Sequence, residues 1–388
     1  MSGLPTDEAY ARAALTYLAE PADRWLARLL RSHGAASTLD VIKSGRETGP
    51  GISGGPRPEL RAALERWRAR LAELPRPEEV LAFRESGIRL VCPGDPEWPG
   101  QLADLGDRQP YALWLRGSAD LRFSCLRSVA VVGARAATAY GSYVAAEFAA
   151  SVAARGWAVV SGAAFGVDAA AHRGALGADG VTVAVLACGV NVPYPAAHAE
   201  LLDAVAAQGV VVSEWPPGRH VSRLRFLVRN RVIAALAAGT LVVEAGERSG
   251  AVNTARNARD LGRRLMAVPG PVTSDLSAGC HRVIRDWQGT LVTSAADVIE
   301  HLSPVGAPLT AAGGGMPLTV PPPVFPRDLL DPESAQVLDA MPGRGGVSTL
   351  RVAQRAGLAP TVTATRLGEL AAAGFVERCT AGWRLRHA

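Results

Sequence analysis

Apolar runs of strand length alternate with longer Ala-rich stretches between residues 127 and 302. The runs are SVAVVG, AVVSG, VTVAVLACG, VVVSE, TLVVEA and RLMAVPG. Strands buried on both faces form continuous apolar runs, and strands that alternate with helical stretches are typical of βαβ units. The pattern therefore predicts an α/β domain over residues 127–302, in which helices cover both faces of a parallel sheet.

Two segments precede this domain. In residues 1–75, the stretch RWLARLLRSHGAASTLDVI has apolar residues at helical spacing around a glycine turn, which predicts a small helical module of the SAM or helix-hairpin kind. Residues 76–126 are rich in Pro, Gly and aromatic residues, which indicates short strands and turns in a connecting segment packed on the next domain.

Two further segments follow the α/β domain. Residues 303–330 contain too much Pro and Gly to build a core and are expected to form a linker. In residues 331–388, three helical patterns lead into the strands FVERCT and GWRLR, an order that predicts a winged-helix domain. Its third helix, Thr361 to Ala373, carries little charge beyond Arg366 and Glu369, so both DNA binding and protein contacts remain open for this domain.

The composition is ordinary for a folded protein that does not enter a membrane. A length of 388 residues exceeds one usual core, and 48% hydrophobic residues occur without an apolar run of membrane length. The start, MSGLPTDEAYARAAL, has acids where a signal peptide has basic and apolar residues, so we expect a cytoplasmic protein. The five cysteines are scattered and lack CxxC spacing, which favours reduced thiols over disulfides or a zinc site.

The positive charge is almost entirely arginine. The formal net charge is +5, the pI is about 9.2, and Lys43 is the only lysine. Arginine is suited to bidentate phosphate contacts and to stacking on bases. A coding bias, which the Ala content also favours, explains the same enrichment without any function, so the charge alone decides little.

The first candidate ligand site is the strand-to-helix junction VAVVGARAATAYGS. In an open parallel sheet, ligands bind at the carboxyl ends of the strands, where helix N-termini attract anions. The junction offers Gly133 and Arg135 but lacks the GxGxxG pattern, and the next strand ends in Ser161 and Gly162 where a dinucleotide site needs an acid. We therefore expect that this junction binds no NAD or other cofactor. Gly133 and Arg135 better suit a phosphate that belongs to a bulkier chain.

The second junction, SGAAFGVDAAAH, contains small residues that let a ligand approach the backbone. Gly166 belongs to this loop, Asp168 is placed to cap the following helix, and His172 stands one turn later as its partner. That structural interpretation is favoured over a catalytic dyad, because no serine or cysteine stands at a nucleophile-elbow spacing.

The third junction, VVEAGERSGAVNTARNA, ends a strand at Glu244 and begins a helix near Ser249 and Gly250. Ser249 and Thr254 offer hydroxyls at the helix start, which suits an oxyanion. Glu244 is a candidate general base, but no partner is spaced to assist it, so a structural role is favoured. The sequence contains no HExxH, Walker A, EF-hand or Cys/His cluster, so neither metal nor ATP chemistry is expected.

The stretch VSRLRFLVRNRVIAAL places four arginines at the start of an apolar helix. No acid stands between Glu214 and Glu244, so ion pairs within the segment are excluded. With a helix start near Phe226, the first two arginines lie in an approach loop. Arg229 and Arg231 are then expected to frame a phosphate-binding groove with an arginine of the first junction, unless one of the pair is structural.

Several motifs in order resemble the DNA-processing protein A family, also called Smf. They are GAR, SGAAFGVDAAAH, GVNVPYP, SEWPPG, FLVRNRVIAAL, VVEAGERSGAVNTARNA and AVPGP, with DPEWPGQLADL and PYALWLRG upstream. The family's Gly-Ser/Thr-Arg turn corresponds to residues 133–135 with Ala134 as a departure. Leu227 replaces a proline of the Phe-Pro-x-Arg-Asn-Arg motif, and His198 and His281 stand where the family often has asparagine.

This resemblance implies an extended Rossmann-like domain that binds single-stranded DNA without sequence preference and has no enzymatic activity. It also implies a homodimer and the RecA recombinase as partner, in natural transformation or another recombination task. The DNA-binding residues that we predict on both grounds are Gly133, Arg135, Ser161, Gly162, Gly166, Arg225, Arg229, Asn230, Arg231, Ser249, Gly250 and Thr254.

Two alternatives from other classes remain. A Rossmann-like nucleotide enzyme, such as a nucleoside-monophosphate phosphoribohydrolase, would use Glu244 beside a Gly-Gly-x-Gly-Thr loop, but AGERSG stands there. A transcription regulator would bind DNA with the winged helix and use the sheet domain to sense a ligand.

Overall fold

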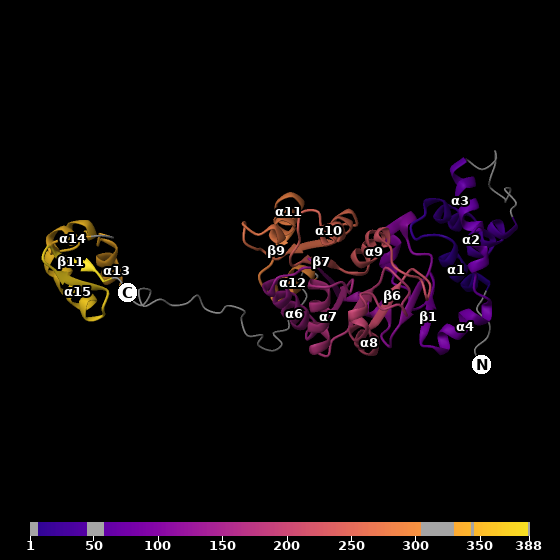
Figure 1. The fold of residues 1–388 in the computed structure, drawn as a ribbon, viewed down its shortest axis with the longest axis horizontal. Helices are drawn as coiled ribbons and strands as arrows, with labels where there is room; N and C mark the ends of the chain where they lie inside the picture. Colours follow the sequence, from indigo (N-terminus) through magenta and orange to yellow (C-terminus); the bar gives the residue numbers. More distant parts are fainter. Residues whose placement is uncertain (1–6, 45–57, 304–329, 343–344, 387–388) are drawn as a thin grey trace. The chain divides into compact units, whose positions relative to one another are not determined.

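The protein is described from a computed structural model, which covers residues 7–44, 58–303, 330–342 and 345–386 (Figure 1). The chain divides into two compact units, residues 1–313 and residues 314–388, which are described separately. No helix in the described part of the chain is long and apolar enough to cross a membrane.

The first unit contains a nine-stranded sheet with the order β1-β2-β6-β5-β4-β3-β7-β8-β9. Along this order, each strand from β6 through β3 to β9 runs parallel to its neighbour. Strand β2 instead pairs antiparallel with both β1 and β6. The predicted α/β fold with a parallel, Rossmann-like sheet is confirmed. The strands are β1 Ile88–Val91, β2 Leu113–Arg116, β3 Ser128–Val132, β4 Ala158–Ser161, β5 Thr182–Val185, β6 Val210–Ser213, β7 Gly239–Val242, β8 Arg264–Ala267 and β9 Thr290–Leu291.

Helices cover both faces of this sheet (Figure 1). Strands β3 to β7 are buried at every position, and Val, Ala and Leu fill most of these positions, as in parallel strands covered on both faces. Helices α5, α9, α10 and α11 pack on one face, and helices α6, α7, α8 and α12 pack on the other. The helices are α5 Leu121–Leu126, α6 Ala139–Ala153, α7 Val167–Gly177, α8 Ala199–Gln208, α9 Arg223–Leu236, α10 Gly250–Asp260, α11 Ala278–Trp287 and α12 Ala295–Leu302.

The chain order of the strands reverses at β3, which lies between β4 and β7. The loops after these three strands therefore diverge to opposite faces and leave a crevice at their carboxyl ends, where open α/β sheets bind ligands. This reversal positions the candidate site.

The N-terminal helices pack around a core of their own and against the antiparallel edge of the sheet. Gly34, with a φ of 74°, interrupts helix α2 and provides the expected glycine turn. The indole of Trp114 in β2 donates a hydrogen bond to Thr16 Oγ1 at 3.2 Å, which joins the sheet to the first helix. The helices are α1 Asp7–Leu18, α2 Arg24–Ser44, α3 Pro58–Arg68, η1 Leu71–Glu73 and α4 Pro77–Glu85, and the 3-10 helix η2 Gly100–Arg108 lies between β1 and β2.

The second unit contains three helices followed by an antiparallel hairpin. Its small core includes Val352, Leu367, Leu370 and Trp383. The elements are α13 Pro332–Asp339, α14 Thr349–Ala356, α15 Pro360–Ala372, β10 Val376–Cys379 and β11 Gly382–Leu385.

Candidate functional site

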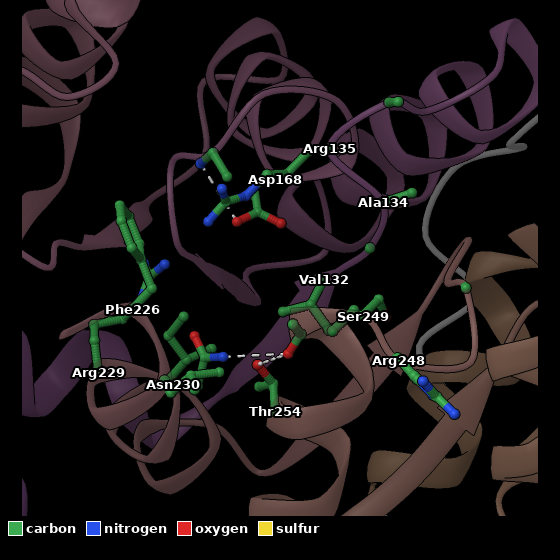
Figure 2. Close-up of a pocket in the computed structure, with 18 of the residues that line it drawn as sticks. Val132, Ala134, Arg135, Asp168, Phe226, Arg229, Asn230, Arg248, Ser249 and Thr254 are labelled. Atoms are coloured by element: carbon green, nitrogen blue, oxygen red, sulfur yellow. Dashed lines mark hydrogen bonds between the residues drawn. The ribbon is translucent and has the colours of Figure 1, made fainter. Parts of the chain in front are cut away.

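A pocket of about 800 Å³ opens at the carboxyl ends of β3, β4 and β7 (Figure 2). Its walls come from the loops after these strands and from the first turns of α9 and α10. Seven of the twelve predicted binding residues line it: Gly133, Arg135, Arg229, Asn230, Ser249, Gly250 and Thr254. The pocket therefore brings together all three sequence junctions and the Arg-rich helix.

The loop after β3 brings an arginine to the mouth of this pocket. A Cβ atom at Gly133 would lie 2.5 Å from Val167 Cγ2 and 2.8 Å from the Glu244 carbonyl oxygen, so only glycine allows the loops to pack this closely. Arg135 is exposed, and its guanidinium carbon lies 4.9 Å from the ring centroid of Phe226 in α9. Such stacking holds a guanidinium in place while its N–H groups remain open to a ligand.

Arg229 lies buried at the floor of the pocket. Its Nη1 donates a hydrogen bond to the Val185 carbonyl oxygen, and its Nε has no protein partner. Burial lowers the pKa of Arg229 to about 10, while the nearby Asp168 opposes the shift, so the side chain is cationic at neutral pH. Burial likewise raises the pKa of Asp168, against the opposing effects of Arg229 and of backbone N–H groups.

The start of α10 forms another wall of the pocket. Ser249 caps the helix by accepting a hydrogen bond from Val252 N at 3.3 Å. Asn230 Nδ2 donates to the Gly250 carbonyl oxygen and to Asn253 Oδ1, both at 3.2 Å, and so fixes α9 against α10. A helix N-terminus directed at a pocket favours an anion through its free N–H groups and its dipole.

Arg231 does not take part in this pocket. Its Nη1 and Nη2 donate to Glu214 Oε1 and Oε2, both at 2.6 Å, and both side chains are 3% exposed. Its Nε donates to the Arg108 carbonyl oxygen at 2.9 Å. The expectation that Arg231 frames the groove is corrected, because its partner is Glu214, the acid directly after β6, 17 positions earlier in the sequence.

Arg225 also points away from the pocket. It forms an ion pair with Glu20 of the N-terminal helices at 2.5 Å. Helix α9 begins at Arg223, so the first two arginines of the segment lie in its first turn and not in an approach loop. Arg223 itself lines the pocket.

Ser161, Gly162 and Gly166 of the second junction support the floor and do not line the pocket. Ser161 Oγ donates to the Val131 carbonyl oxygen at 2.7 Å. A Cβ atom at Gly162 would meet the Arg229 guanidinium at 2.2 Å, and one at Gly166 would meet the Ala134 carbonyl oxygen at 2.3 Å. We expected these glycines to let a ligand approach the backbone. In the structure they instead let other groups of the protein pack closely.

Three titratable residues considered for chemistry are committed to structure. Glu244 accepts hydrogen bonds from Thr138 N at 2.9 Å and Thr138 Oγ1 at 2.6 Å, at the cap of α6. Asp168 Oδ2 accepts from loop N–H groups ahead of α7, and His172 Nδ1 is 2.7 Å from Thr182 Oγ1, so Asp168 is not its partner. No group of three or more His, Cys, Asp or Glu side chains suited to a metal occurs in the described part of the chain.

Of the residues that depart from the family pattern, Ala134 and Leu227 line the pocket, whereas His198 and His281 do not. Leu227 is 50% exposed. His198 is buried with Nδ1 at 3.0 Å from the Ala163 carbonyl oxygen, and His281 Nε2 is 2.9 Å from the Gly270 carbonyl oxygen.

Sequence reasoning missed other residues that line the pocket. Arg248 stands between the end of β7 and the cap Ser249, is exposed, and extends away from Asn230 and Thr254 (Figure 2). Tyr194 is 40% exposed, and its ring centroid lies 5.5 Å from that of Phe226. The strand-end rule that selected Arg135 also applies to Arg248, whereas no local pattern marks Tyr194.

Comparison with known proteins gives one consistent result. Residues 89–303 match the model of a family described as DNA recombination-mediator protein A. A putative DNA processing protein DprA of Mycobacterium tuberculosis is 42% identical over 396 residues, which cover 99% of this chain and 95% of the relative. The DNA processing protein DprA of Bacillus subtilis is 34% identical over 58% of this chain and 75% of its own length.

Two solved structures resemble the fold. DNA processing protein A of Streptococcus pneumoniae matches with a TM-score of 0.61 at 30% identity, over 77% of this chain and 98% of that chain. DNA processing protein A of Helicobacter pylori, reported for its single-stranded DNA binding mode, matches with a TM-score of 0.50 at 25% identity, over 55% and 95% of the two chains.

Proposed function

The chain belongs to the DNA recombination-mediator protein A family, and on that basis we propose that it binds single-stranded DNA, without sequence preference, in the pocket at the strand ends. The observation that carries this proposal is the cluster in which Phe226 contacts both the tilted ring of Tyr194 and the guanidinium of Arg135, in the pocket that the N-terminus of α10 also lines. Proteins that bind single strands combine aromatic platforms for bases with cationic grooves for the backbone. The pocket contains both parts.

The charges suit a phosphate backbone. Arg135, Arg223 and Arg248 are exposed around the pocket, and none of them forms an ion pair with a described residue. Arg229 adds a buried positive charge at the floor. Phosphates near the start of α10 would accept hydrogen bonds from its backbone N–H groups and interact favourably with these guanidinium groups.

The wider role follows from the family. We propose that the protein acts as a homodimer that protects incoming single strands and helps to load a RecA recombinase, in the cytoplasm. We propose that the first helices form a small helical module and that the second unit is a winged helix, which its order of three helices before a hairpin supports. The domain limits 1–75, 76–126, 127–302, 303–330 and 331–388 are retained as part of this proposal; residues 304–329 lie outside the described residues.

We propose no enzymatic activity. The side chain of Glu244, the base that a phosphoribohydrolase would need, is occupied by Thr138 at the cap of α6. Release of a free base from a nucleoside monophosphate, lost in Glu244→Gln, would contradict this part of the proposal.

The test is a salt titration of oligonucleotide binding. The wild-type protein should bind a single strand more tightly than a duplex of the same length, and its affinity should fall steeply with salt. The double variant Arg135→Ala with Arg248→Ala should lower the slope of log K against log[salt] by roughly 1.4, since each lost phosphate contact contributes ~0.7 on single strands.

The matched control removes two positive charges that do not line the pocket, from the face of the sheet that α6 and α7 cover. Arg155 follows α6, and Arg173 lies exposed on α7. Arg155→Ala with Arg173→Ala should retain the wild-type slope. A flat salt dependence, or equal affinity for duplex and single strand, would refute the proposal.

A further inference from the structure

A single carboxylate of the N-terminal helices contacts two elements beside the pocket. Glu20 stands between α1 and α2. Its Oε2 accepts hydrogen bonds from Trp215 Nε1 and from Arg225 Nε, both at 3.0 Å, and its Oε1 accepts from Arg225 Nη2 at 2.5 Å. Arg70 adds a longer ion pair at 3.7 Å.

Glu20, Trp215 and Arg225 form one cluster. The Arg225 guanidinium carbon lies 5.7 Å from the ring centroid of Trp215, whose side chain is 1% exposed. The backbone of Glu20 is held as well, because the Tyr111 hydroxyl donates to the Glu20 carbonyl oxygen at 3.0 Å and accepts from Asp23 N at 2.8 Å. Glu20 is therefore fixed through its side chain and its main chain.

The residue that Glu20 holds belongs to the first turn of α9. On this turn, Arg223, Leu224, Phe226 and Leu227 line the pocket, whereas Arg225 points to the N-terminal helices. Phe226 is the ring on which Arg135 stacks. The orientation of this turn sets where the aromatic and cationic parts of the pocket meet.

A second contact supports the same segment. Arg219 Nη2 lies 2.8 Å from Glu73 Oε2 and donates to the Tyr17 carbonyl oxygen at 3.2 Å. The chain from the end of β6 to the start of α9 is thus attached to the N-terminal helices at two points, although no residue of those helices lines the pocket.

We propose that Glu20 is a positioning residue for single-stranded DNA, which acts through Arg225 to fix the first turn of α9. This inference rests on the proposed function of the pocket. It assigns to the N-terminal helices a part in DNA binding, even though none of their residues lines the pocket.

The proposal makes a prediction of sign. An acid near a polyanion site repels the ligand. If charge were the only effect, removing the acid would therefore strengthen binding. If Glu20 positions the pocket, Glu20→Ala instead weakens single-strand binding, on the order of tenfold, through faster dissociation. The salt slope should stay at the wild-type value, because no phosphate contact is removed.

Two further variants identify the path. Arg225→Ala should weaken binding, and the double variant Glu20→Ala with Arg225→Ala should be no weaker than the more affected single variant, because both remove one interaction. Glu20→Gln, which retains a hydrogen-bond acceptor, should recover part of the affinity.

The control is Glu79→Ala in α4, which removes an exposed acid that is paired with Arg76 and does not line the pocket. It should bind as the wild type does. Tighter or unchanged binding by Glu20→Ala, or additive effects in the double variant, would overturn the inference, whereas absence of single-strand binding by the wild type would instead refute the proposed function.

Discussion

Arg229 lies directly against Gly162: a Cβ atom added to this glycine would be 2.2 Å from Arg229 Nη1 and 2.6 Å from its Cζ. The buried guanidinium at the pocket floor therefore occupies the space that any other residue at position 162 would fill. The position of the Arg229 guanidinium therefore depends on the absence of a side chain at Gly162, in the loop after β4.

Gly162→Ala should displace Arg229 and lower the free energy of unfolding by ~1–3 kcal/mol, as overpacking of a tight site does. Single-strand affinity should fall with it, because the cation leaves the pocket floor. Chemical denaturation and oligonucleotide binding measure the two effects. The control is Gly177→Ala, where no heavy atom lies within 4 Å of the added Cβ; wild-type stability and affinity for Gly162→Ala would show that Arg229 does not depend on the glycine.

Arg231 and Arg135 should separate stability from binding. Arg231→Ala leaves Glu214 buried without its partner, so we expect a loss of ~3–5 kcal/mol in the free energy of unfolding. Arg135→Ala removes an exposed side chain and should leave that free energy nearly unchanged while weakening single-strand binding. The reverse assignment of effects, measured by denaturation and by binding, would contradict the roles that we derive from burial.

Tyr194 should contribute to affinity but not to salt dependence. If a base stacks on its exposed ring, Tyr194→Ala lowers the binding free energy by ~1–3 kcal/mol. The slope of log K against log[salt] should match the wild type, since a phenol ring displaces no counterions from the strand. A changed slope at unchanged affinity would show that the ring is not a stacking platform.

His172 should make the fold sensitive to mild acid. Burial lowers the pKa of its imidazole from 6.5 to about 3. Below pH 6.5 the unfolded chain binds a proton that the folded chain excludes, so stability falls as the pH falls, by up to ~1.4 kcal/mol per pH unit. This contribution is fully present above pH 6.5 and is lost progressively as the pH falls toward 3.

The measurement compares unfolding free energies at pH 7 and pH 5. His172→Asn should remove up to one proton from the pH dependence, whereas Thr182→Val, which keeps the imidazole and removes its 2.7 Å partner, should be less stable at both pH values and retain the dependence. An unchanged pH dependence in His172→Asn would show that another group is responsible.

The sheet and the location of the pocket were predictable because they depend on local patterns. Apolar runs of four or five residues mark buried parallel strands, and ligands bind at the carboxyl ends of such strands. The same rule selected Arg135, Ser249 and Gly250, which do line the pocket. Helix α9 starts three residues earlier than expected, at Arg223, a typical uncertainty of helix boundaries.

The direction of individual side chains was not predictable from spacing. Arg229 and Arg231 are two positions apart on α9, so they point to different sides of the helix, and only the fold shows which side faces the pocket. The ion pairs that hold Arg231 and Arg225 join residues far apart in the sequence, Glu214 and Glu20. Such long-range pairs have no signature in a helical repeat.

The antiparallel edge of the sheet also imposes an order in time. Strand β2 is completed by β6, which the ribosome adds about a hundred residues later, or about 5–20 seconds at the usual rates of synthesis. During that interval the antiparallel pair of β1 and β2 exposes the edge that β6 later covers, and unpaired edges favour association with other chains. The helices that emerge first pack on a face of this strand pair, through Thr16 at Trp114 and through the shared apolar cluster, so the contacts that bury this face of β2 are available before β6 is synthesised.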